Sequence, residues 1–492
     1  MSPGWKTWIC RWLCRVFCAA FVLSASANDL GPLYDKIRLT LEPGYGYEAA
    51  GPLWGNYQLD EERSLWRFSP LMSMSTDEGA DFTEFDLAYP LLTYDRFGAE
   101  YRFQIGQLFA FSGGRRGDED KDKRFTLFPL YFQQRSTNPT NNFTAVMPFY
   151  GRLQNRLFRD EVKWVMLPLY LQSRKRDVVT DNYLYPFFHL REGDGLKGWQ
   201  FFPVFGQERK EVTYQTDMWD EKQMVPGHYK MFAGWPFFSF ERRALGTENP
   251  VMATHLLPLY ALQRSALKNS TTVMWPFLRY STDTTTNYRE VNAPWPFIVW
   301  ARGENRHIDR VWPIWSDTRA GFTRSKVFLF PLYKEKTIDS PEVKSRRTRI
   351  ALSLYQDIHD ESLETGQDRR QIHLWPLFAY ERDFEDKARL QLIAPLEPLL
   401  RNNKGVKRNY SPMWSIYRKE ENPNTGFKSH SILWNLLRFD RNKVARKDSI
   451  LFGLFRYEST PEGSEARLFH FIRLKGKGGG EVSEEPAEEE KP

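Results

Sequence analysis

The tetrapeptide Phe128-Pro129-Leu130-Tyr131 recurs, with small variations, along almost the whole chain. Clear copies are Leu167-Pro168-Leu169-Tyr170 and Trp235-Pro236-Phe237-Phe238. With the proline position as the mark, 23 copies stand at positions 32, 52, 70, 90, 107, 129, 148, 168, 186, 203, 236, 258, 276, 296, 313, 331, 353, 376, 395, 412, 435, 453 and 470. Successive marks lie 17 to 23 residues apart, except for one gap of 33 after Pro203. This period indicates a repeat fold.

Runs of about 10–12 residues rich in Phe, Tyr, Trp, Val and Leu surround the marks, which is the composition of β-strands. Polar segments separate the runs, for example 136–142 (STNPTNN), 192–198, 281–287 and 402–408. A strand of about 11 residues and a turn of about 8 account for the period, whereas helical repeats need about 34 residues or more per unit. The sequence therefore predicts one strand per copy, with the proline near its middle. If the 33-residue gap after Pro203 contains one more strand, near 212–219, the number of strands is even, as in bacterial barrels.

An arginine column accompanies the repeat. The residue six positions after the mark is Arg in 13 copies. Such residues bind phosphate, sulfate or carboxylate as bidentate donors, or they lie at strand ends with the head group in water or among lipid headgroups. With one strand per copy, alternate copies run in opposite directions, so we expect the column to split between the two rims. The candidate anion or headgroup contacts are Arg135, Arg174, Arg209, Arg242, Arg264, Arg302, Arg319, Arg382 and Arg418.

Composition narrows the class of protein. The 492 residues are 41% hydrophobic, 27% charged and 16% aromatic. This aromatic share can bury a large core, which excludes disorder for most of the chain. The formal net charge of +7 comes from mixed signs, so it does not indicate a nucleic-acid binder.

The two ends of the chain differ from the repeat. Lys6, Arg11 and Arg15 precede a short apolar run and the small-residue sequence Ala25-Ser26-Ala27, which predicts a signal peptide over residues 1–27. All three cysteines lie in that segment, so no disulfide framework is expected after its removal. The sequence predicts a single β-repeat domain over 28–474, followed by a flexible acidic tail over 475–492.

In this pattern the chain resembles the bacterial outer-membrane β-barrel proteins as a class. The resemblance rests on the export signal, the absence of a hydrophobic helix and the even succession of strands and turns. It implies a large antiparallel up-and-down β-barrel of about 22–24 strands in the outer membrane of a Gram-negative bacterium. Its partners would be outer-membrane lipid and the barrel-assembly machinery, and its role passage, export or envelope scaffolding. No functional residue is carried over from this class.

Two features disagree with a barrel. Proline is largely excluded from central strands because it donates no hydrogen bond, and the acidic tail follows the last expected strand, 468–474. The alternative is a soluble periplasmic or surface β-repeat protein that acts as a binding or structural module.

Motifs for catalysis are weak. The eight histidines are scattered, and no zinc-ligand spacing, P-loop or G-x-S-x-G is present. Residues 265–268 match S-x-x-K without its partner motifs, and the acidic clusters 77–86 and 118–120 have the composition of solvated loops. We therefore expect a protein that is not an enzyme, with no catalytic residue, metal, cofactor, nucleic acid or identifiable small-molecule substrate.

Overall fold

The computed structural model describes residues 34–114, 122–216, 220–401, 403–469 and 472–477. Within these residues the chain forms 45 strands, 43 of them in a single antiparallel sheet and two in a separate hairpin. The prediction of an all-β, up-and-down sheet is confirmed. The expected signal peptide lies outside the described residues. The last strand extends to Lys477, three residues into the expected tail, and residues 478–492 also lie outside the described part.

The first 15 strands are β1 (Asp35–Arg38), β2 (Tyr45–Ala49), β3 (Trp54–Gln58), β4 (Arg63–Phe68), β5 (Met72–Asp77), β6 (Phe82–Leu87), β7 (Leu92–Phe97), β8 (Glu100–Ile105), β9 (Phe109–Gly114), β10 (Asp122–Leu127), β11 (Tyr131–Ser136), β12 (Phe143–Val146), β13 (Tyr150–Arg156), β14 (Arg159–Val165) and β15 (Tyr170–Lys175). The next 15 are β16 (Val178–Tyr183), β17 (Phe188–Gly193), β18 (Leu196–Phe201), β19 (Phe205–Lys210), β20 (Thr213–Thr216), β21 (Lys222–Val225), β22 (Gly227–Ala233), β23 (Phe238–Leu245), β24 (Val251–Leu256), β25 (Tyr260–Arg264), β26 (Lys268–Val273), β27 (Leu278–Asp283), β28 (Tyr288–Asn292), β29 (Ile298–Arg302) and β30 (Arg306–Val311). The last 15 are β31 (Trp315–Ala320), β32 (Thr323–Phe328), β33 (Tyr333–Asp339), β34 (Val343–Ile350), β35 (Tyr355–Ser362), β36 (Asp368–Leu374), β37 (Phe378–Arg382), β38 (Ala388–Leu392), β39 (Tyr417–Asn422), β40 (Phe427–Ile432), β41 (Leu437–Arg441), β42 (Arg446–Ile450), β43 (Phe455–Thr460), β44 (Gly463–Leu468) and β45 (Ile472–Lys477).

Each copy of the repeat is a pair of short strands. β10 ends at Leu127, β11 begins at Tyr131, and these two residues face each other in the ladder. The residues between them, Phe128-Pro129-Leu130, form the turn. The prediction of about 22–24 strands with proline near the middle is therefore wrong: the strands have four to eight residues. The physical reason is that proline cannot donate to the ladder but suits a tight turn.

The sheet is a meander in which strands that follow one another in the chain are hydrogen-bonded neighbours. The exception is the hairpin β20–β21, which is inserted between the paired strands β19 and β22. β20 accounts for the strand expected near 212–219. Segment 402–408, expected to be a polar turn, leads instead into the helix α2 (Lys404–Asn409), with Asn403 as its N-cap, and α3 (Ser411–Trp414) follows. No helix among the described residues has the length and apolar character needed to cross a bilayer.

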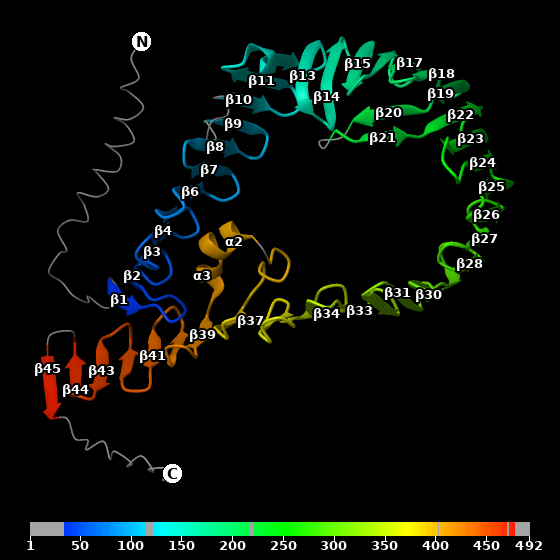
Figure 1. The fold of residues 1–492 in the computed structure, drawn as a ribbon. Coiled ribbons are helices and arrows are strands. Elements are labelled where there is room, and N and C mark those ends of the chain that lie inside the picture. Colours follow the sequence, from blue (N-terminus) through cyan, green and yellow to red (C-terminus); the bar gives the residue numbers. More distant parts are fainter. Residues whose placement is uncertain (1–33, 115–121, 217–219, 402, 470–471, 478–492) are drawn as a thin grey trace, which may run out of the picture.

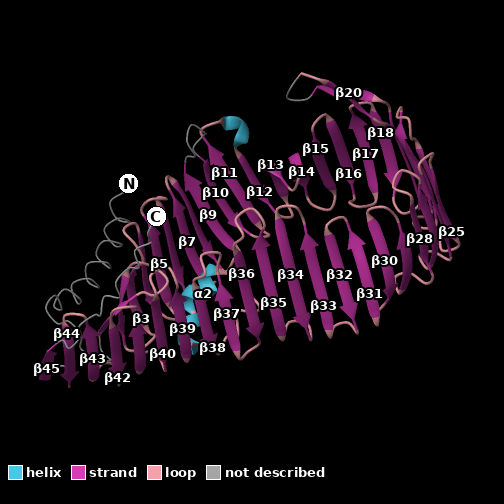
Figure 2. Cartoon of the chain, turned by 60° about the horizontal axis from the view of Figure 1, so that its bottom comes forward, coloured by secondary structure: helices cyan, strands magenta, loops and turns pink. Residues whose placement is uncertain are grey.

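The meander has two rims and two faces. The apolar rim is the edge made by the turns that follow even-numbered strands and carry the prolines, and the polar rim is the opposite edge (Figure 2). The sheet curves around an open interior that contains α2 and α3 (Figure 1). The outer face carries Tyr131 and the other residues in register with it, and the inner face carries Phe132 and its counterparts.

The sheet does not close into a barrel, which corrects the expectation from the sequence. In the described part of the chain, β1 pairs with β2 and β45 with β44, and no strand of one end pairs with the other end. The N-terminal strands instead lie across the inner face of the C-terminal strands (Figure 1). A strand of six residues is about 20 Å long, whereas a membrane-spanning strand needs about 9–11 residues.

Two small apolar clusters form the buried core, and both lie on the inner face. The first joins β12, β13 and β14 around Ala145 and Trp164, and the second joins β28, β29 and β30 around Ala301 and Ile308. Figure 1 shows the sheet bending near both places. Outside the overlap of the two chain ends and the region of α2 and α3, the sheet is a single layer (Figure 1), and in the described structure no element covers its outer face.

Candidate functional site

The apolar rim exposes large hydrophobic side chains without interruption. In every copy from mark 70 to mark 376, the residue directly after the mark is at least 46% exposed. These residues are Leu71, Leu91, Leu108, Leu130, Phe149, Leu169, Phe187, Val204, Phe237, Leu259, Phe277, Phe297, Ile314, Leu332, Leu354 and Leu377. The largest apolar patch on an ordinary soluble monomer covers about 300–600 Å² and is itself often functional. A continuous exposed rim of this kind is therefore a candidate contact surface.

The backbone of the apolar rim is hydrogen-bonded from turn to turn. Leu169 donates to the carbonyl of Met166 within its turn, at 2.8 Å. The next turn donates back to it: the Leu184 amide bonds the Leu169 carbonyl at 2.8 Å, and the Tyr185 amide bonds the Pro168 carbonyl at 2.8 Å. The same ladder recurs from Ser69 to Phe469. Donors satisfied inside the protein are what an apolar surrounding requires of a backbone.

Several rim residues adopt a backbone conformation that turns in water usually give to glycine or asparagine. Leu184 has φ 51°, Met274 has φ 50° and Leu352 has φ 64°, and their side chains are 56%, 61% and 65% exposed. The left-handed conformation costs an L-residue about 1–2 kcal/mol. At the polar rim the same conformation is held by residues such as Asp194 and Asn287. The apolar rim thus keeps large hydrophobic residues where solvent exposure would favour small polar ones.

On the outer face, one row of apolar strand residues next to the turns, the apolar level, extends the apolar surface of the rim. Leu127 faces Tyr131 and Val165 faces Tyr170, and the apolar level runs in register along the sheet to Phe328 and beyond. At the next level, two residues further, the side chains are mixed. On β33, Glu335 at that level pairs with Arg346 at 3.0 Å. On the outer face, the region without charged side chains therefore consists of the turns and the one row of strand residues next to them.

The arginine column lies at one level of the sheet and does not split between the rims, which corrects the prediction. Because each copy is two strands, every copy runs in the same direction, and the residue six after the mark lies near the polar rim. Eight of the nine candidate arginines are on the outer face, four residues along the strand from the apolar level: Arg135, Arg174, Arg209, Arg242, Arg264, Arg302, Arg319 and Arg382. Arg418 faces inward, opposite Gln391, because α2 and α3 shift the register of that copy.

The outward arginines mainly bond their own sheet. Arg135 donates to the carbonyls of Gln134 (2.8 Å) and Phe143 (2.7 Å), and Arg264 and Arg302 repeat this pattern. Two of the others form ion pairs with carboxylates: Arg382 with Asp368 and Asp386, and Arg209 with Glu211. Arg174 donates to the carbonyl of Arg176, and Arg242 lies over the ring of Phe240. The column therefore stabilises strand ends and leaves seven exposed cations along one rim.

The overlap of the two chain ends forms a second feature, the polar seam. In it, Arg438 donates to the carbonyl of Arg38 (3.1 Å) and Asn422 to that of Thr40 (3.1 Å). From α2, Arg408 donates to Ser73 at 2.8 Å and pairs with Glu84 and Asp86. These side chains come from positions more than 300 residues apart and hold the ring shut without strand pairing. Other bonds across the seam are Arg456 to Asp35, Asn409 to Asp86, Tyr410 to the Tyr89 carbonyl and Asn435 to Glu48.

The seam buries charge. Burial raises the pKa of the Tyr57 hydroxyl, which donates to Glu48 at 2.6 Å. Burial also opposes ionisation of Glu420, but Arg389, at 2.6 Å, and Arg418 outweigh it and lower the pKa of Glu420 to about 2. An ion pair removed from water is worth little net stability while intact, but losing one partner costs about 3–5 kcal/mol. The seam therefore specifies how the ends meet.

The other motifs have structural explanations. Ser265 of the S-x-x-K match accepts from the Lys268 amide (2.9 Å) and donates to the Lys268 carbonyl (3.0 Å), so it closes a polar turn. His373 is fully buried, and burial lowers its pKa. The described residues contain no group of three or more His, Cys, Asp or Glu placed to hold a metal ion. Acidic residues 118–120 lie outside the described residues.

The sequence had indicated the arginines but missed the apolar rim and the polar seam. The available signal for the rim was hydrophobic residues beside a turn-forming proline. Comparisons of the chain with protein-family models and with curated proteins find no match.

Proposed function

We propose that this is an exported envelope protein that inserts its apolar rim into one leaflet of a membrane, most simply the outer membrane of a Gram-negative bacterium. Its role is to scaffold or enclose an area of membrane surface, for passage or export of material across the envelope. The observation that carries the proposal is the continuous apolar rim with an internally hydrogen-bonded backbone.

The dimensions of the sheet favour shallow insertion. Four residues separate Tyr131 at the apolar level from Arg135 near the polar rim, a distance of about 14 Å along a strand. The hydrocarbon core is about 30 Å thick, so half of it accommodates the turns and the apolar level without burying the arginines. Amphipathic elements that bind membranes in this way insert their apolar face by about 5–10 Å.

The energetics favour lipid as the covering layer. A single-layer sheet needs a second layer to bury its apolar face, and burying one Leu or Phe side chain contributes about 1.5–3 kcal/mol. Tryptophans at the turns, including Trp235 and Trp275, are 52% and 46% exposed. Tryptophan is enriched at membrane–water interfaces because its ring is apolar and its N–H is polar.

Flotation with neutral phosphatidylcholine vesicles tests the proposal. Wild-type protein should float, and a variant with Leu130→Asp, Leu169→Asp, Leu259→Asp and Leu332→Asp should stay at the bottom of the gradient. The matched control places four aspartates in polar-rim turns (Thr286→Asp, Asn305→Asp, Gln367→Asp and Asn424→Asp) and should float like the wild type.

Two outcomes would contradict the proposal. Wild-type protein that stays dissolved and monomeric without detergent, and does not float, would favour the soluble β-repeat protein. A detergent-free dimer that dissociates in the Leu→Asp variant, again without flotation, would show that a second copy covers the rim.

A further inference from the structure

The inner face carries a cluster of cations on two paired strands, β33 and β34. The ladder places Lys334 directly opposite Arg349 and Lys336 directly opposite Arg347. All four side chains are on the inner face, because Lys334 and Lys336 alternate with the outward residues Tyr333 and Glu335. Like charges directly opposite each other destabilise a sheet. The arrangement therefore has a cost that needs a counter-charge to offset it.

The same inner face shows the opposite arrangement on other strands. On β19, β22 and β23, Glu208 faces Lys230, which faces Glu241 in turn, and Lys230 pairs with Glu241 at 3.4 Å. Within the described residues, none of the four cations on β33 and β34 forms such an ion pair. Where like charges meet elsewhere on this face, carboxylates offset them: Arg456 faces Arg467, and the two pair with Asp35 and Glu465.

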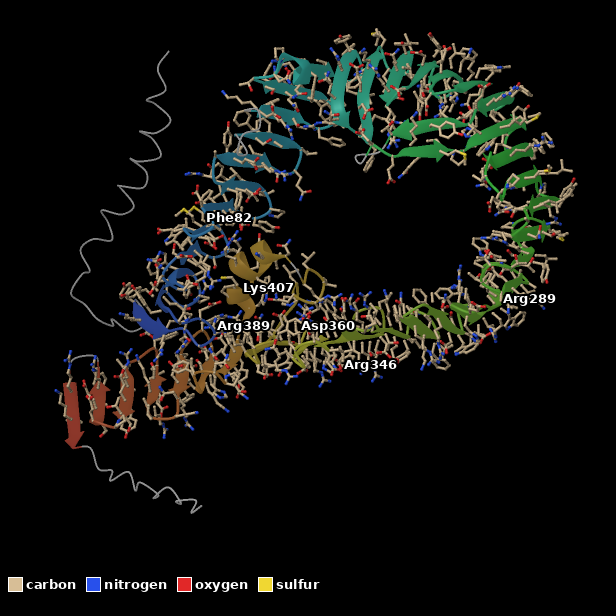
Figure 3. All side chains as sticks on the ribbon, viewed as in Figure 1. Phe82, Arg289, Arg346, Asp360, Arg389 and Lys407 are labelled. Carbon is tan, nitrogen blue, oxygen red and sulfur yellow. The ribbon has the colours of Figure 1, made fainter. Side chains whose placement is uncertain are left out.

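Two further groups face this cluster. Arg401, in the connection after β38, has its pKa lowered by burial and by the nearby charges of Arg349 and Arg347, so it is a fifth cation in the group. Asp360 is an acid on the same face of the neighbouring strand β35, and it already accepts from Ser345 at 2.6 Å and from Arg369 at 2.7 Å. Figure 3 shows Asp360 on the inner side of the sheet and Arg346 of the same region on the outer side. The cluster thus has a large positive excess on the inner face alone.

The position of the cluster points to its ligand. Lys334 and Arg349 occupy the inner row next to the turns of the apolar rim. We propose that Lys334, Lys336, Arg347, Arg349 and Arg401 bind a phosphate group, and that the phosphate is carried by the headgroup of an anionic lipid at the inner wall of the ring. Arginine binds phosphate oxygens bidentately, and lysine adds point charge. The lipid source rests on the proposed insertion of the rim; the phosphate chemistry does not.

Full-length protein is tested on phosphatidylcholine vesicles with and without phosphatidic acid. Wild type should bind the anionic vesicles more tightly, in a salt-dependent way. The variant Arg347→Gln/Arg349→Gln should bind the anionic vesicles about thirtyfold more weakly than wild type, as expected for two cations near an anionic surface. The matched control, Lys344→Gln/Arg346→Gln, removes two outward cations from the same strand and should keep most of the gain. A second measurement, the thermal shift with inorganic phosphate, reports a soluble source.

The outcomes separate the two proposals. Equal gains on anionic vesicles for both variants, with no difference between their phosphate shifts, would overturn the phosphate site while leaving rim insertion intact. Loss of binding to neutral vesicles by wild type and variants alike would overturn rim insertion, and a phosphate shift lost only in Arg347→Gln/Arg349→Gln would still support the site. Misfolding does not confuse the result, because removing two opposed like charges should leave Tm unchanged or raise it.

Discussion

At single residues of the apolar rim, the backbone conformation favours glycine, whereas the side chain is large and apolar. Leu184 and Met274 hold a left-handed backbone conformation, which glycine adopts without cost, yet both keep a large exposed side chain. A residue that lowers folding stability and is exposed to water gains nothing in a soluble protein. In lipid, the same side chain contributes its burial free energy. Stability and membrane binding should therefore respond in opposite directions to one substitution.

Substitution of Leu184→Gly and Met274→Gly tests this conflict. The variant should unfold at equal or higher denaturant concentration, because glycine relieves about 1–2 kcal/mol per position, while its affinity for neutral vesicles falls. Denaturation in detergent and vesicle partitioning are the two measurements. Asn287→Gly, a polar-rim position with φ 47°, is the control and should leave partitioning unchanged. Lower stability together with unchanged partitioning would contradict the explanation.

At the scale of elements, the sequence indicated strand chemistry, antiparallel order and most polar turns, because alternating aromatic and apolar residues depend on local physics. Proline at position 129 is a signal for a turn at Phe128-Pro129-Leu130, but an apolar turn has the composition of a strand when its surroundings are taken to be water. Assigning this turn to the middle of a strand doubles the predicted strand length and halves the predicted number of strands. The same assignment leads to the prediction that the arginine column splits between the two rims. The polar seam joins residues more than 300 positions apart, and no local pattern encodes such contacts.

The hairpin β20–β21 should be dispensable for the sheet. Its two strands form their own ladder, and β19 pairs directly with β22 without it. An isolated two-stranded hairpin is marginally stable at best. Replacing residues 212–226 with a two-residue Asn-Gly turn should therefore change Tm by only a few degrees. Loss of the cooperative unfolding transition would show that the hairpin supports the sheet.

At the scale of the whole molecule, the ring is held shut by side chains of the polar seam. Glu420 lies buried on β39, one of the C-terminal strands that the N-terminal strands cover, and Arg389 and Arg418 lower its pKa to about 2 against burial. A carboxylate with a depressed folded-state pKa contributes stability above its usual pKa of about 4.5, and loses this contribution as pH falls toward the folded value. Acid should therefore destabilise the buried ion pair between β38 and β39, on the part of the sheet that carries the seam.

Unfolding free energy measured against pH should fall by about 3 kcal/mol between about pH 4.5 and pH 2 from this group alone. Glu420→Gln should be less stable at neutral pH and should show a flatter acid dependence. A Glu420→Gln profile parallel to that of the wild type would show that this buried charge does not contribute to the acid dependence of stability.

A polarity-sensitive fluorophore at single positions reports whether the apolar rim inserts into a bilayer. With the three N-terminal cysteines replaced by serine, the chain offers a unique labelling site at Leu259→Cys on the apolar rim or Asn305→Cys on the polar rim. On phosphatidylcholine vesicles, we expect a blue shift and protection from an aqueous quencher at position 259, and neither change at position 305. Equal spectra and equal quenching at both positions, on vesicles that carry the bound protein, would contradict the account.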